Sequence, residues 1–91
     1  MLPVIWKPQA EKDLLSIIEF VGERDAWAAE HLGNALRAST WPLPEHPYLF
    51  RPGRVPGTRE IVAHPNYIVV YRVALTCIEV LRVLHARQQY P

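Results

Sequence analysis

A proline-rich middle segment divides this chain into two halves with different hydrophobic patterns. Residues 42–57 hold five of the nine prolines and two of the four glycines, the two residue types that most often interrupt helices and strands. Before this segment, apolar residues recur at the spacing of a helix, and after it they form short runs rich in β-branched and aromatic side chains. We therefore expect residues 42–57 to be mostly loop, with room for a short strand at 48–51.

The first half predicts a short strand followed by a helical hairpin. Residues 2–6 form an apolar run typical of a strand, and Pro8 suits the first turn of a helix. Leu14, Ile17, Ile18 and Val21 then form one apolar stripe at three- and four-residue spacing. Residues 22–25 break this pattern, and a second helix is expected over 26–40. Two consecutive helices with so short a break predict an αα-hairpin.

The second half predicts three strands, over residues 58–64, 67–73 and 77–84. Their connections are too short for a parallel crossover, which needs a dozen or more residues, so neighbouring strands must be antiparallel. The expected fold is therefore of the α+β class: an N-terminal strand, an αα-hairpin and an antiparallel three-stranded meander. The N-terminal strand is expected to join this sheet.

The predicted strands are apolar on both faces, which is more than one helical hairpin can cover. Simple alternation over 77–84 would place Leu84 on the face of Ile78 and Val80, with Val83 on the opposite face. Large exposed apolar surfaces usually mark contacts with a partner. The second face is therefore expected either to meet a partner or to lie under the loop at 42–57.

Size and composition are those of one small domain spanning residues 1–91. The N-terminus lacks the pattern of a secretory signal, no apolar run is long enough to cross a membrane, and Cys77 is the only cysteine. We therefore expect a cytoplasmic protein. Residues 1–30 have a charge balance of −3, and residues 51–91 have one of +4. This asymmetry indicates either a basic face for an anionic partner or ordinary surface solubility.

Four short segments, in this order, resemble the RelE/ParE superfamily of bacterial type II toxins. They are Ala10–Leu14 (AEKDL), Arg59–Val62 (REIV), Tyr67–Val73 (YIVVYRV) and Ile78–Arg87 (IEVLRVLHAR). The resemblance covers nearly the whole chain. It implies a small toxin inactivated by a cognate antitoxin protein, the two forming a hetero-oligomer. It also implies one of two targets: the ribosome with its messenger RNA, which RelE-like members cut, or DNA gyrase, which ParE-like members poison.

If the chain is a RelE-like endoribonuclease, the resemblance implies a site made of Arg59, His85, Arg87 and Tyr90. RNA cleavage needs a base, stabilisation of a charged phosphorane and a proton donor, and these side chains could supply such groups. However, the only lysines are Lys7 and Lys12, so the lysine-rich strand of the RelE branch is missing. The ending LRVLHAR is closer to ParE-like sequences. The sequence therefore favours a gyrase poison, which would not be an enzyme, over the ribonuclease.

The sequence predicts neither a metal ion nor another cofactor. The four histidines (His31, His46, His64 and His85) and Cys77 lack the spacing of metal ligands. There is also no glycine-rich phosphate-binding loop.

Overall fold

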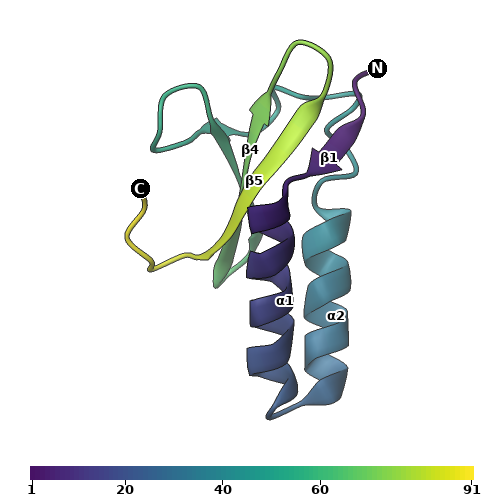
Figure 1. Ribbon diagram of the computed structural model, residues 1–91, viewed down its shortest axis with the longest axis vertical. Coiled ribbons are helices and arrows are strands. Elements are labelled where there is room, and N and C mark those ends of the chain that lie inside the picture. The colour runs from purple at the N-terminus through teal and green to yellow at the C-terminus, as the bar shows by residue number, and fades with distance from the viewer.

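Two helices lie side by side and pack on one face of a five-stranded sheet in the computed structural model, which describes residues 1–91 (Figure 1). The elements in chain order are β1 (Val4–Trp6), α1 (Pro8–Gly22), α2 (Ala26–Ala38), β2 (Arg51–Pro52), β3 (Arg59–His64), β4 (Tyr67–Val73) and β5 (Ile78–His85). The turn between α1 and α2 lies at the end of the molecule farthest from the β4–β5 turn (Figure 1). Neither helix has the length and apolar character needed to cross a lipid bilayer.

The helical hairpin confirms the prediction made from the first half of the sequence. Pro8 opens α1, where its missing N–H costs no helical hydrogen bond. Asp25 caps α2 by accepting a hydrogen bond from the Ala28 amide at 3.0 Å. The second helix ends at Ala38, two residues before the predicted end, and a turn then leads to Pro42.

The strand order in the sheet is β1-β5-β4-β3-β2. Strands β3, β4 and β5 form the predicted antiparallel meander, and β1 joins it by pairing in parallel with β5. The short strand expected at 48–51 is displaced to Arg51–Pro52, where it pairs with β3. The segment before it contacts the helix-covered face instead, where Phe50 packs on the core and the Pro47 carbonyl accepts a hydrogen bond from the Tyr71 hydroxyl.

A β-bulge in β5 changes which residues face the helices. Tyr71 pairs with Val80 but Val70 pairs with Arg82, so Leu81 is an extra residue in β5. As a result Val83 packs with Val80 in the core under the helices, while Leu84 lies on the other face. The prediction from simple alternation was therefore wrong for Val83 and Leu84, because one inserted residue reverses the alternation beyond it.

Asp13 joins α1 to the sheet where β1 ends. The last contact along β1 is from the Lys7 amide to the Val80 carbonyl, at 2.9 Å. Beyond that point the Asp13 carboxylate accepts hydrogen bonds from the Val83 amide at 3.0 Å and from Arg82 Nε at 2.8 Å. A side chain of α1 thus satisfies an edge amide of β5 that would otherwise lack a partner in the sheet.

Candidate functional site

The second face of the sheet is partly covered by the chain itself. Ile68, Val70 and Leu84 are buried there, and half-buried Tyr90 packs on them. The C-terminal tail that carries Tyr90 leaves β5 on the side of the sheet away from α2 (Figure 1). The apolar surface expected to need a partner or the 42–57 loop is covered in part by Tyr90 of residues 86–91, the tail segment, while Val62 on the same face is 58% exposed.

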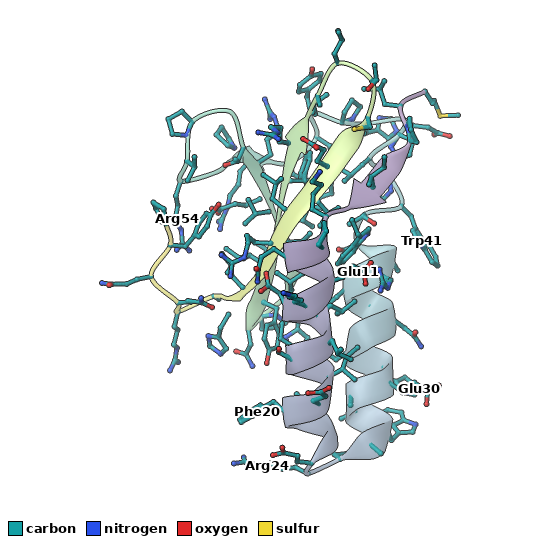
Figure 2. All side chains as sticks on the ribbon, viewed as in Figure 1. Glu11, Phe20, Arg24, Glu30, Trp41 and Arg54 are labelled. Atoms are coloured by element: carbon teal, nitrogen blue, oxygen red, sulfur yellow. The ribbon has the colours of Figure 1, made fainter.

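A buried carboxylate, which sequence reasoning did not single out, organises this second face. Glu60 is only 3% exposed, and Arg51 Nε and Nη2 donate to its Oε1 at 3.2 and 3.0 Å. The Arg54 amide donates to Oε2 at 3.2 Å, and Arg54 Nη1 donates to the Gln88 carbonyl at 3.0 Å. Figure 2 shows Arg54 on the side where the tail passes. Glu60 and Arg54 thus form a polar clasp that holds the tail segment.

Arg59 lies on the opposite, helix-covered face and is engaged by the backbone. Its Nη1 donates to the carbonyls of Phe50 at 2.8 Å and Tyr48 at 3.3 Å. Its guanidinium lies over the Tyr48 ring, 5.0 Å from the centroid. Arg59 forms no ion pair with a carboxylate. The guanidinium therefore fixes the shape of a loop through Nη1, which donates both of these hydrogen bonds.

His85 and Arg87 lie together at the far end of β5. The Arg87 amide donates to His85 Nδ1 at 3.1 Å, and the His85 ring meets Tyr67 edge-on with centroids 5.4 Å apart. Both rings line a cleft of about 290 Å³ between α1 and the sheet, which also receives Phe20. Phe20 projects outward from the lower part of α1 (Figure 2). This cleft could admit a small planar group, since it joins aromatic and polar side chains.

The four residues proposed for a nuclease do not converge on one point. Arg59 of β3 pairs with Tyr71 of β4, and His85 of β5 pairs with Tyr67 of β4. The backbone positions of Arg59 and His85 are therefore four residues apart, measured along β4. That separation is roughly 14 Å at the rise of an antiparallel strand. Tyr90 packs on the other face of the sheet. A catalytic role for Arg59, His85, Arg87 and Tyr90 remains a prediction.

Most of the positive charge of the second half is neutralised within the chain. Four of its six arginines are paired with carboxylates: Arg51 and Arg54 with Glu60, Arg72 with Glu79, and Arg82 with Asp13. The Asp13 hydrogen bond raises the pKa of Arg82 further above its already high usual value. Only Arg59 and Arg87 carry a charge without an acidic partner. The basic face expected from the sequence is thus weaker than the charge count suggests.

A groove of about 810 Å³ runs along the helical hairpin. Small residues of α2, Ala26, Ala29 and Gly33, lie opposite Leu14 and Ile18 of α1. A Cβ on Gly33 would lie 2.9 Å from Ile18 Cδ1, so glycine is what allows the helices to approach this closely here. Charged Glu30 and Arg37 and the exposed Trp41 also line the groove, and Glu30 and Trp41 point outward from the hairpin (Figure 2). Nowhere do three His, Cys, Asp or Glu side chains gather closely enough to hold a metal ion.

Comparison with known proteins identifies the family. The sequence profile of the ParE toxin of type II toxin–antitoxin systems (parDE) matches residues 4–90, almost the whole chain. The chain belongs to the ParE toxin family. It is thus a toxin of the RelE/ParE superfamily, as the four sequence segments predicted.

The relatives of this ParE-family chain support the assignment in sequence and in structure. The candidate toxin Y4kP of Sinorhizobium fredii is 36% identical over 87 residues, covering 94% of this chain and 90% of the relative. Toxin RelE2 of Caulobacter vibrioides is 31% identical over 88 residues, covering 94% and 97%. A chain of the chromosomal ParDE system of P. aeruginosa superposes with a TM-score of 0.85 at 22% identity, covering 93% and 96%. The α+β fold predicted from the sequence is therefore the fold of known toxins of this superfamily.

Proposed function

We propose that this ParE-family toxin inhibits growth by binding and poisoning DNA gyrase, and that it does not cleave RNA. The observation that carries this proposal is the separation of Arg59 and Tyr90 from His85 and Arg87. Relatives with both ParE-like and RelE-like names occur, so family membership alone leaves the target open. The proposal is therefore supported by where the candidate residues lie along the strands.

Cleavage of RNA requires several groups to meet at one phosphate. A base, a phosphorane-stabilising cation and an acid must all lie within hydrogen-bond reach of the reacting atoms, about 3 Å. Arg59 and His85 are too far apart along β4 to meet this requirement together. Arg59 is also occupied by two backbone carbonyls. A toxin that stalls an enzyme by binding needs no such convergence, only a complementary surface.

The groove on the helical hairpin supports an antitoxin partner. Solved structures similar to this chain include the ParDE system of P. aeruginosa and the DinJ–YafQ complex of E. coli, with TM-scores of 0.85 and 0.53. The small residues of α2 would let the backbone of a partner helix approach closely, and the apolar lining would bury its apolar stripe. We therefore assign the groove to an amphipathic segment of the antitoxin, the complex being a hetero-oligomer.

A ribosome-dependent endoribonuclease is the alternative function, and one observation favours it. His85 and Tyr67 line the 290 Å³ cleft, where a base could stack on the aromatic rings, and the backbone amide of Arg87 donates to His85 Nδ1. In that case Arg87→Ala and His85→Ala would abolish cleavage of translated messages while leaving the protein folded.

One experiment with purified components separates these functions. Supercoiling by DNA gyrase and cleavage of a message in a reconstituted translation reaction are measured side by side, each with increasing toxin. We expect loss of supercoiling or trapped cleaved DNA, with the message intact. Ribosome-dependent cleavage with unaffected gyrase would overturn the proposal and make Arg59, His85, Arg87 and Tyr90 the first residues to mutate.

A further inference from the structure

Two consecutive residues of the loop between α2 and β2 have large, exposed apolar side chains. Tyr48 is 64% exposed and Leu49 is 63% exposed, although their neighbours Pro47 and Phe50 are half-buried. Exposed single apolar residues are ordinary, but an adjacent exposed pair offers more apolar surface in one place. We call Tyr48 and Leu49 the loop tip.

Two side chains of the sheet, Arg59 and Tyr71, hold the loop tip in place. Arg59 donates to the carbonyls of Tyr48 and Phe50, on either side of Leu49, and packs against the Tyr48 ring. The Tyr71 hydroxyl donates to the Pro47 carbonyl at 2.6 Å. Burial raises the pKa of Tyr71 above its usual value, so its hydroxyl remains a donor at neutral pH. Phe50 anchors the end of the loop by meeting the Tyr71 ring edge-on, with centroids 6.4 Å apart.

Such fixed geometry lowers the entropic cost of binding through the loop tip. A mobile loop must be ordered when it docks, whereas a loop already held in place binds with less loss of freedom. Beside the tip lies a hollow of about 260 Å³, lined by Tyr48, Pro52, Gly57, Thr58, Arg59 and Val73. The guanidinium of Arg59 has no carboxylate partner, so the positive charge beside this hollow is uncompensated. A partner with an apolar pocket and a carboxylate at its rim would complement both features.

We propose that the loop tip, Tyr48 and Leu49, is the surface through which the toxin engages its target protein, and that Arg59 and Tyr71 are positioning residues for it. The target surface is an apolar pocket with an acidic rim. The inference rests on the proposed function, since it takes gyrase to be that target. Under this proposal Arg59 acts in binding the target and not in cleaving RNA.

The loop tip and the hairpin groove share no lining residue, which separates the target from the antitoxin. The groove is formed by α1, α2 and Trp41, whereas the loop tip and its hollow are formed by the loop, β2, β3 and β4. Changes at Leu49 should therefore weaken inhibition of gyrase without weakening capture by the antitoxin.

The first test replaces Leu49 by serine and uses Leu75→Ser as the matched control. Leu75 is 94% exposed in the β4–β5 turn, so both substitutions remove an exposed leucine without disturbing the core. We expect Leu49→Ser to raise the toxin concentration that half-inhibits purified gyrase by about tenfold or more, as for a central interface residue. Leu75→Ser should inhibit like the wild type. Equal inhibition by both variants would overturn the inference, whereas a wild type that never inhibits gyrase would overturn the proposed function instead.

The second test releases the loop tip without altering its apolar side chains. Tyr71→Phe removes the hydrogen bond to the Pro47 carbonyl and keeps the charge of Arg59. Arg59→Gln removes the hydrogen bonds to the Tyr48 and Phe50 carbonyls together with that charge. We expect faster chymotrypsin cleavage after Tyr48 in Arg59→Gln and Tyr71→Phe, together with about three- to tenfold weaker inhibition. Both variants should bind the cognate antitoxin as the wild type does. Faster cleavage with unchanged inhibition would show that a fixed tip is not needed and would refute the positioning role.

Discussion

The helix-covered face of the sheet is closed by apolar side chains, whereas the opposite face is only partly covered, by a short tail and a polar clasp. Leu14 and Leu36 of the helices pack on Val69 and Tyr71 in one continuous core. On the other face only three buried apolar residues meet Tyr90, and Glu60 with Arg54 holds the tail segment. One face thus depends on many small contacts and the other on a few specific ones.

This difference implies that the two faces open under different conditions. Apolar burial contributes in proportion to area and is lost only when the core itself comes apart. A tail held by a carbonyl, a guanidinium and one aromatic ring can leave without unfolding the rest, because local opening costs less than global unfolding. We therefore expect the tail-covered face to become exposed more readily than the helix-covered face.

The largest loss of stability is expected from truncating a buried side chain on the helix-covered face. Leu36 is fully buried, and Leu36→Ala should lower the free energy of unfolding by about 2–5 kcal/mol, from lost burial and the cavity left behind. Urea denaturation followed by circular dichroism would measure it. Leu15→Ala, at an exposed position of α1, is the control and should change stability by less than about 0.5 kcal/mol. Similar losses in both variants would mean that the hairpin does not close this face.

A smaller loss is expected when the clasp on the other face is broken. Glu60→Gln removes the negative charge facing Arg51 and Arg54 and should cost about 1–2 kcal/mol, because both arginines are exposed enough to regain water. Glu45→Gln changes an exposed carboxylate outside any ion pair and serves as the control. Hydrogen exchange should also rise in the tail segment of Glu60→Gln. Unchanged hydrogen exchange in the tail segment would show that Tyr90 holds this segment without the clasp.

The parts of the fold that follow local patterns were predictable from the sequence. The helical stripe beginning at Leu14, the break at Gly22 and the β-branched run Tyr67–Val73 each correspond to an element in the structure. Local periodicity and chain breaks determine such elements largely by themselves. The bulge at Leu81 was not predictable, because an apolar residue gives no local sign that it will be the unpaired one.

The contacts that shape the candidate surfaces depend on residues distant in sequence. Glu60 looked like an ordinary strand glutamate, yet it meets Arg51 and Arg54 across a loop that no periodicity describes. Arg59 was singled out by family resemblance, but its partners are carbonyls of residues 48 and 50, whose path the prolines left open. A sequence identifies such side chains more readily than the atoms that they contact.

A change in the tail segment would sharpen the contrast between the two faces. Tyr90→Ala should cost about 1 kcal/mol, because Tyr90 is only half-buried against Ile68, Val70 and Leu84. Gln89→Ala, at the exposed neighbouring position, should have no measurable effect. The loss in the double variant with Arg54→Ala should be less than the sum of the single losses, since both residues hold the same tail. Additive losses would mean that the clasp and the ring act independently.

The smallest effect is expected from pH, at an ion pair on the surface of the helical hairpin. Both guanidinium nitrogens of Arg37 donate to Glu11, at 2.8 and 2.6 Å, and this hydrogen bonding holds the pKa of Glu11 below its ordinary value of 4.5. The folded state therefore favours the charged carboxylate, so the pair contributes stability above about pH 4.5 and loses it as pH falls through the lowered pKa. Both side chains are 45% exposed, which limits the contribution to about 0.5 kcal/mol or less. Urea unfolding of wild type and Glu11→Gln should thus differ slightly at pH 7 and converge at acid pH. A difference that persists in acid would implicate the packing of Arg37 on the Trp6 ring, 4.7 Å from its centroid, rather than the carboxylate charge.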